Sequence, residues 1–294
     1  MNRFRVSHRT EYTYGSPVID GFTMAHLLPR PTPSQRLVSA DLLIDPPPDE
    51  LGETTDQFGN RVVRFAVHHL HERLTIEAIS EVVHTPRIFD GEHPTWESVA
   101  ERIATSTGDI AVDVAPFVAE SPLAALVPEL AELTGPVFTP GRSIIDVVID
   151  LCHTINREFR FDAGGGDVTT PVAAVIAARR GVCQDFAHVA VAALRSRGLA
   201  ARYVSGYIET QPPPGQPKLV GVDASHAWAS AWFPGFGWLE FDPTNDQIPP
   251  RNHVSVAWGR DYGDVAPVRG VVISSGGGQE LDVAVDVTRV APAT

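Results

Sequence analysis

Residues 179–187, with the sequence RRGVCQDFA, decide the fold of the second half of the chain and suggest its chemistry. From Phe186 to Leu194 apolar residues recur at intervals of three and four, which predicts an amphipathic helix beginning at Cys183 and ending before Gly198. The first N–H groups of a helix lack intrahelical partners and carry partial positive charge, which favours a thiolate over a thiol. Cys183 is therefore predicted to carry a reactive sulfur facing the sheet on which the helix packs.

Strand-like segments follow this helix at residues 201–208, 226–233 and 238–242, and a Pro-Gly turn joins the last two. Pairing of Trp232 with Trp238 would place His226 diagonally beside Asp242, roughly 7–8 Å away between backbones. A register shifted by one residue would separate them onto opposite faces. The hairpin therefore predicts a hydrogen bond between His226 and Asp242.

Cys183, His226 and Asp242 are together the groups that thiol catalysis needs. Cys183 would be the nucleophile, His226 the base and later the acid, and Asp242 the group that fixes the orientation and tautomer of His226. The backbone N–H of Cys183, at a helix start, is a candidate donor to an oxyanion. The second oxyanion donor cannot be named from the sequence.

Four segments resemble the bacterial transglutaminase-like cysteine enzymes. They are residues 181–188 (GVCQDFAH), 202–207 (RYVSGY), 223–228 (DASHAW) and 238–244 (WLEFDPT). Residues 1–85 look like the β-sandwich commonly found ahead of that core, and residues 259–264 look like the segment that follows it. The resemblance implies an α+β, papain-like core with an N-terminal β-sandwich, and it carries the roles of nucleophile, base and orienting acid onto Cys183, His226 and Asp242.

Two features depart from related enzymes. The tryptophan that animal transglutaminases use upstream of the nucleophile has no counterpart, since Trp96 is too distant, and Gln184 follows the cysteine where papain-type enzymes have a glutamine before it. No EF-hand-like acidic loop is present, so calcium dependence is not predicted. The superfamily includes transglutaminases, peptidases, peptide N-glycanases and inactive members, so the fold does not choose the substrate.

The sequence divides into a β-rich segment at residues 1–85, a helical connector or lid at 86–140, and a catalytic core with a C-terminal strand extension at 141–294. Within these we expect helices over 96–103, 123–133 and 143–159, and a short helix after Pro171 that ends before Gly181. Alternation over 281–288 predicts a half-buried strand.

The length, the net charge and the number of cysteines exclude several classes of protein. The chain has 294 residues and a formal net charge of −13, which disfavours binding to nucleic acid or to anionic membranes. Two cysteines cannot form a disulfide framework, no signal peptide is evident and no apolar run is long enough to span a membrane, so a cytoplasmic protein is expected. The oligomeric state cannot be predicted.

Other residues have competing interpretations. Cys152 continues an apolar helical stripe and is expected to be buried and inert, and His68, His69 and His71 are expected on a solvated strand, with no metal site. Gln184, Trp228, Trp238, Arg260 and Tyr262 are candidate substrate contacts, although the tryptophans are more often core residues and Arg260 could equally form a structural ion pair.

Two functions compete. The first is a cysteine-dependent amide hydrolase or acyltransferase that needs no cofactor and acts on peptide or protein amides through a thioester. The alternative is a catalytically idle module that keeps the fold for binding or scaffolding, against which stands the presence of all three catalytic residue types.

Overall fold

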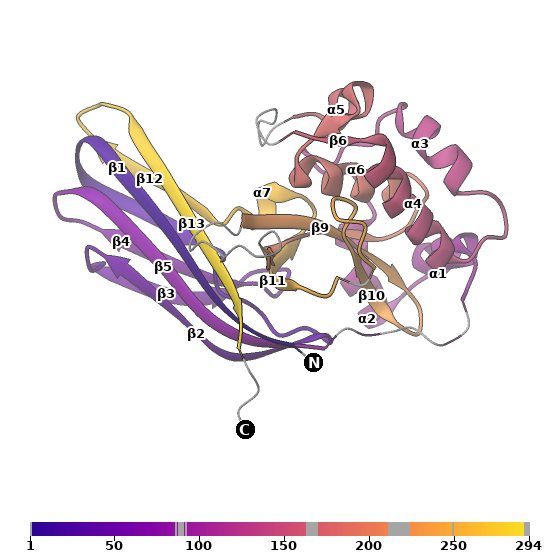
Figure 1. Cartoon of the computed structure of the whole chain (residues 1–294), viewed down its shortest axis with the longest axis horizontal. Helices are drawn as coiled ribbons and strands as arrows, with labels where there is room; N and C mark the ends of the chain where they lie inside the picture. Colours follow the sequence, from indigo (N-terminus) through magenta and orange to yellow (C-terminus); the bar gives the residue numbers. More distant parts are fainter. Residues whose placement is uncertain are drawn as a thin grey trace, which may run out of the picture.

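The computed structural model describes residues 2–85, 87, 91, 93–162, 170–210, 224–248 and 250–290. Figure 1 shows a β-rich part beside a part in which helices cover a second sheet. Asp223, which belongs to the third family-like segment, lies outside the described residues. Among the described residues, no helix is long and apolar enough to cross a membrane.

The β-rich part is organised around one long strand, β1, whose two halves have different neighbours. The first half pairs with β5 and β13, and the second half pairs with β4 and β12. Strands β2 and β3 add to β5 and β4. The strands are β1 (Asn2–Ala25), β2 (Gln35–Asp45), β3 (Glu50–Thr55), β4 (Arg61–Val67), β5 (His71–His84), β12 (Val268–Ser274) and β13 (Gln279–Arg289).

Two strands that are not neighbours in this sheet share a small apolar core. Val63, Phe65 and Val67 of β4 belong to one buried cluster with Leu74 and Ile76 of β5. All of these strands belong to one seven-stranded sheet. Residues 1–85 are therefore β-rich, as predicted, within a single hydrogen-bonded sheet.

The second part has a four-stranded antiparallel sheet in the order β10-β9-β8-β11. Its strands are β8 (Ala201–Ile208), β9 (Ala224–Phe233), β10 (Gly237–Phe241) and β11 (His253–Gly259). A minimal two-stranded sheet pairs β6 (Arg160–Phe161) with β7 (Arg180–Gly181). The sheet and its helices form the α+β core that the sequence predicted.

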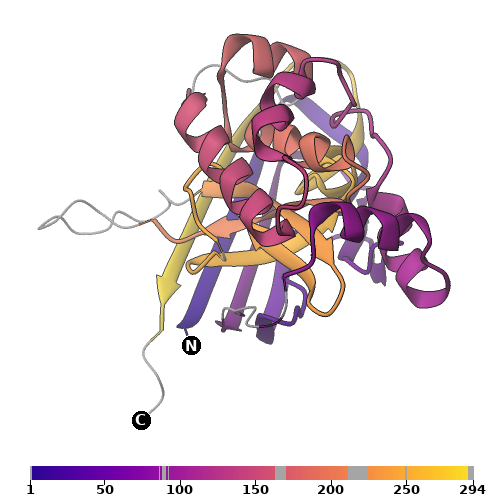
Figure 2. The same cartoon turned by 90° about the vertical axis from the view of Figure 1, so that its right-hand side faces the viewer.

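Helix α6 is the centre of this core. It is buried from Asp185 to Arg195 and contacts β8 and β9 on one side and α3, α4 and α5 on the other. Alanines at 187, 190 and 193 let the sheet approach closely, and Figure 2 shows the helices gathered in front of the strands. The helices are α1 (Trp96–Ala104), α2 (Gly108–Val114), η1 (Ala115–Phe117), α3 (Leu130–Val137), α4 (Ile144–Glu158), α5 (Val172–Ala178), α6 (Cys183–Arg195) and α7 (Tyr262–Val265).

Helix α4 begins where the sequence predicts. The side chain of Ser143 accepts a hydrogen bond from the Asp146 N–H at 3.1 Å, which caps the first turn. Val148, Leu151, Cys152 and Ile155 then form its buried stripe. The apolar spacing and the capping serine are thus enough to define this helix.

One helix boundary differs from the prediction. The helix expected over 123–133 begins only at Leu130, because Ser121 and Ala124 form a tight bridge and the Leu123 N–H donates to Asp261. Local hydrogen bonds therefore override the apolar spacing there. The helix after Pro171 ends at Ala178, before Gly181 as expected, and Arg179 follows it in a left-handed conformation with φ 49°.

The structure also shows how the three predicted segments of the chain pack together. Strand β13 contains the predicted alternating segment and pairs with β1 of the β-rich part, while its Val285 and Val287 also belong to the buried cluster of the core. In the segment 86–140, Val99, Ile103 and Leu133 belong to the same buried cluster as α4 and α6. The helical connector is therefore part of the core.

Candidate active site

The start of α6 is held by a carboxylate from its own first turn. The Val182 N–H donates to Asp185 Oδ2 at 2.9 Å, so Asp185 stabilises the helix start as the sequence indicated. A Cβ on Gly181 would lie 2.5 Å from the same oxygen, so only glycine fits there. Cys183 is the first residue of the helix and is partly exposed.

The hairpin of β9 and β10 has the predicted register. Trp238 lies opposite Trp232, and the recorded pairing continues to Phe241 opposite Ala229. Asp242 follows directly and forms a bridge with Gln247. Asp242 and His226 therefore meet on one face of the sheet.

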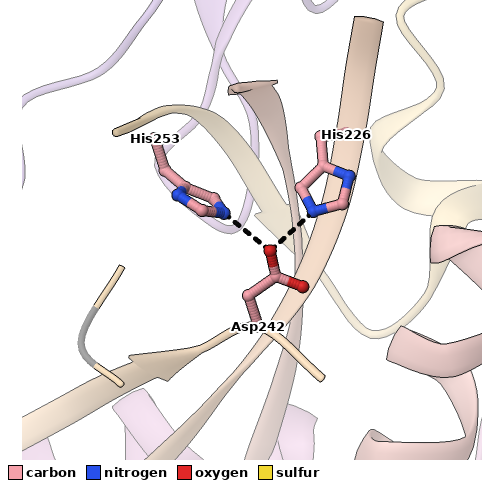
Figure 3. Close-up of side chains that lie close together, drawn as sticks. All are labelled: His226, Asp242 and His253. Carbon is pink, nitrogen blue, oxygen red and sulfur yellow. Dashed lines mark hydrogen bonds and ion pairs between the residues drawn. The ribbon is translucent and has the colours of Figure 1, made fainter. Parts of the chain in front are cut away.

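Figure 3 shows His226 and His253 converging on the carboxylate of Asp242. The Nε2 atom of each imidazole lies 2.8 Å from Asp242 Oδ2. An ionised carboxylate only accepts hydrogen bonds, so both imidazoles carry their proton on Nε2 when Asp242 is charged. The hydrogen bond between His226 and Asp242 is confirmed.

Asp242 is completely buried and receives further donors. The N–H groups of Thr244 and Asn245 donate to Oδ1 at 2.9 and 3.2 Å, and the side-chain amide of Asn245 donates to Oδ2 at 2.7 Å. Burial alone would raise the pKa of Asp242, but the hydrogen bonds from His226 and His253 outweigh it and hold the pKa far below its usual range. The carboxylate therefore stays ionised.

His226 has an elevated pKa. Its burial favours the neutral form, but the hydrogen bond to Asp242 and the hydrogen bond and charge interaction with Cys183 raise the pKa to about 10. The imidazole thus holds its proton at neutral pH, bonded to the carboxylate of Asp242 and interacting electrostatically with Cys183. Such an arrangement can stabilise a thiolate and later deliver a proton.

His253 was not found by sequence reasoning. It is 1% exposed, opens β11 and packs edge-on against Trp228 with ring centroids 4.9 Å apart. Its Nδ1 has no hydrogen-bond partner, and burial lowers its pKa, so it is a neutral donor to Asp242. The alternation of Val254, Val256 and Trp258 is a strand signal that could have identified β11, but nothing local shows that it pairs with β8 and so brings His253 beside Asp242.

His226, Asp242 and His253 also supply three potential metal-ligand atoms within 4.8 Å of one another. The 2.8 Å separations between each Nε2 and Oδ2 are those of hydrogen bonds, and the same atoms would have to exchange their protons for a metal. We therefore assign the cluster to hydrogen bonding.

The candidate substrate contacts lie in different places. Gln184 and Tyr262 line a groove next to the site, and the Tyr262 N–H also approaches His188 Nε2 at 3.2 Å. Trp228 is completely buried and donates to Glu240, so it is a core residue. Trp238 donates to Asp113 and lines a separate cavity.

Arg260 forms the structural ion pair. Its Nε and Nη2 atoms lie 2.8 and 2.9 Å from the two carboxylate oxygens of Asp264, a bidentate pair. That pairing occupies the guanidinium. Its role as a substrate contact stays a prediction without a structural observation in its favour.

The remaining candidates also have defined positions. Cys152 is completely buried in α4, and its sulfur donates to the backbone oxygen of Asp242 at 3.3 Å. His68 lies 2.8 Å from Asp20, His69 lies 3.1 Å from Asp49, and both imidazoles are well exposed. These two histidines therefore bond to different carboxylates.

A groove of about 380 Å³ runs between the β-rich part and the core. Gln184 and Ser225, which line it, directly adjoin Cys183 and His226 in the sequence. On its other side the groove is lined by β1 and β13. The groove therefore lies beside the residues that carry the candidate catalytic groups, although its own described lining does not include Cys183 or His226.

Two family models match the chain. Residues 4–83 match the bacterial transglutaminase-like N-terminal region, and residues 132–243 match the transglutaminase-like superfamily, whose match includes Cys183, His226 and Asp242. An uncharacterized protein of Mycobacterium tuberculosis (strain H37Rv) is 40% identical over 97% of this chain and 92% of its own length. The chain belongs to the transglutaminase-like superfamily.

Other comparisons agree with this assignment. A Mycobacterium leprae protein is 32% identical over 99% of this chain and its whole length. A protein-glutamine gamma-glutamyltransferase of Pseudomonas aeruginosa is 39% identical over 74 residues, which are 25% of this chain and 11% of that protein.

The fold is also found in a crystal structure. A protein of Cytophaga hutchinsonii, described as a candidate cysteine protease, has a TM-score of 0.75 at 21% identity and is matched over 100% of this chain and 92% of its own. This likeness shows that the β-rich part and the transglutaminase-like core occur together in one fold.

Proposed function

We propose that this transglutaminase-like protein is a cysteine-dependent amide hydrolase or acyltransferase that acts through a thioester on Cys183. The observation that carries the proposal is the position of His226, which is bonded to Asp242 at 2.8 Å and interacts with Cys183. Sulfur, imidazole and carboxylate in this order are the parts of a nucleophile, a base and an orienting acid.

The first half of the reaction forms the thioester. The Cys183 thiolate attacks the carbonyl carbon of an amide, and the carbonyl electrons move onto oxygen, where the backbone N–H of Cys183 is placed to donate. As the intermediate collapses, the protonated His226 gives its Nδ1 proton to the departing nitrogen. An amine leaves and the acyl group remains on the sulfur.

The second half releases the acyl group. Neutral His226 takes a proton from water or from an amine, which attacks the thioester carbonyl and restores the thiolate. Water gives hydrolysis and an amine gives transamidation. Throughout, the charge of Asp242 keeps the Nε2 proton in place and so directs Nδ1 toward the sulfur.

Intact mass spectrometry tests the proposal. The wild type and Cys183→Ala are incubated with a mixture of glutamine-containing peptides, with and without a primary amine, and then treated with hydroxylamine, which cleaves thioesters. We expect a hydroxylamine-sensitive mass increase in the wild type alone and an amide product when the amine is present. Equal masses for both proteins would favour the idle binding module.

A small alkylating reagent provides a second measurement that needs no substrate. Iodoacetamide should label Cys183 much faster than Cys152, because only Cys183 is exposed and adjoins a protonated imidazole. Slow labelling of both cysteines at the same rate would contradict the proposed thiolate.

A further inference from the structure

One wall of the groove beside the candidate site is formed by regularly paired residues of two strands. Three cross-strand pairs of β1 and β13 line it: Tyr12 with Leu281, Thr10 with Val283, and His8 with Val285. Side chains alternate along a strand, so these six share one face, while Asp282 and Ala284 between them on β13 point to the other. One wall of the groove is therefore a ladder of mostly apolar side chains.

The ladder changes from exposed to buried along its length. Leu281 is 57% exposed, Val283 is 47% exposed and Val285 only 2%. Two exposed aliphatic residues in succession on one strand face are a feature that marks binding surfaces. The ladder is therefore exposed to solvent at Leu281 and Val283 and buried at Val285.

The inner end of the ladder meets the strand that carries His226. The ring of His8 contacts the ring of Tyr207, with centroids 5.4 Å apart. Tyr207 pairs with Ser225, the residue before His226. The inner end of the ladder therefore lies beside the residue that precedes His226 on β9.

The groove is uncharged. None of its described lining residues is Asp, Glu, Lys or Arg, although the whole chain has a formal net charge of −13. Its one histidine, His8, is buried, and burial lowers its pKa to about 4, so it is neutral at pH 7. A charged side chain entering here would lose water without gaining an opposite charge.

We infer that this groove is the acyl-donor site and that it selects peptides whose residues next to the reacting amide are aliphatic or aromatic and uncharged. Val283 and Leu281 contact those residues. The inference rests on the proposed function of Cys183, and it adds a substrate class and gives the C-terminal strand a role in selectivity.

Two peptide chloromethyl ketones of equal length test the inference, one with Leu-Val and one with Glu-Asp before the reactive group. Each alkylates the Cys183 thiolate and releases chloride. The second-order labelling rate constant of the wild type should be at least about tenfold higher for the apolar probe, since small differences in apolar fit are worth roughly 10–200-fold.

A charge placed on the ladder should change this preference. Val283→Lys should slow labelling by the apolar probe and speed labelling by the acidic one, a gain that misfolding cannot produce. Val271→Lys is the matched control, because Val271 is a β12 valine that is 72% exposed and does not line this groove. The control should keep the wild-type ratio.

Iodoacetamide separates failure of the inference from failure of the proposed function. If iodoacetamide labels Cys183 rapidly but the two peptide probes react equally, or if Val283→Lys leaves their ratio unchanged, the groove does not select the substrate and the inference is wrong. If iodoacetamide does not label Cys183 selectively, the proposed function itself fails.

Discussion

The two cysteines of the chain lie in contrasting regions around the same aspartate. Cys152 is in the middle of α4, is completely buried and donates to the backbone oxygen of Asp242. Burial raises its pKa, as does the nearby charge of Asp246. Cys183 opens α6, is partly exposed and interacts with the imidazole bonded to the carboxylate of Asp242.

The comparison teaches that the chemistry of a thiol depends on where its helix places it. A sulfur in mid-helix meets backbone groups already engaged in hydrogen bonds and apolar neighbours, which favour the neutral thiol. A sulfur at a helix start meets free N–H groups, and here a protonated imidazole as well. Cys152 thus donates a hydrogen bond to the backbone of Asp242, whereas the proposed function links Cys183 to the carboxylate of Asp242 through His226.

The largest expected difference between the two cysteines is in turnover. Cys183→Ala should lower the rate of peptide acyl transfer by about 10⁴-fold or more, because removal of a nucleophile abolishes the covalent route. Cys152→Ala should change the rate by less than about threefold. Steady-state kinetics with a peptide found by mass spectrometry measures both, and similar losses in the two variants would contradict the assignment.

Asp242→Asn should have the next largest effect, a fall in kcat of roughly 10³-fold. The amide can donate to His226 Nε2, which would move the imidazole proton to Nδ1 and leave no base facing the sulfur. Loss of the negative charge should also lower the pKa of His226 from about 10. An NMR titration of the His226 ring checks this shift, and an unchanged midpoint would show that Asp242 does not hold the proton.

His253→Phe should lower kcat by about tenfold, because Asp242 loses one of its donors while the aromatic packing on Trp228 is kept. With its charge less dispersed, Asp242 should attract the proton of His226 more strongly, so the pKa of His226 should rise. His26→Phe is a control at another buried histidine, one that interacts with Ala266 and Asp56 and not with the site. An unaltered His226 titration in His253→Phe would limit His253 to packing.

The smallest expected effect is on the free energy of unfolding. Here the substitution of Cys152 should cost more than the substitution of Cys183, the opposite of their effects on turnover. Cys152→Ala should lower the free energy of unfolding by about 1–2 kcal/mol, because it leaves a small cavity and removes the hydrogen bond to Asp242. Cys183→Ala should change it by less than about 0.5 kcal/mol. Urea denaturation followed by circular dichroism measures both, and equal losses would mean that Cys183 is packed as tightly as Cys152.

The parts of the site that follow from local rules were predictable. Apolar spacing and a glycine before the cysteine define α6, and the alternation of β9 with a three-residue turn fixes the register that brings His226 to Asp242. Both depend on residues fewer than twenty positions apart. The sequence alone was therefore sufficient for this pair.

The parts that depend on distant pairing were not predictable. His253 reaches Asp242 because β11 pairs with β8, which comes about 50 positions earlier and has no local signal that names its partner. The apolar face of β13 was recognised, but its partner β1 lies at the other end of the chain. Alternation shows that a strand has a buried face and not which surface will cover it.

The pairing of β13 with β1 has a consequence for how the protein is made. A ribosome produces β1 first, and about 260 more residues must be translated before Gln279–Arg289 can complete the ladder. Cys183 and His226 are therefore synthesised before the strand that supplies half of this wall of the groove. If the wall selects the substrate as we infer, a chain that has lost β13 should lose that selectivity.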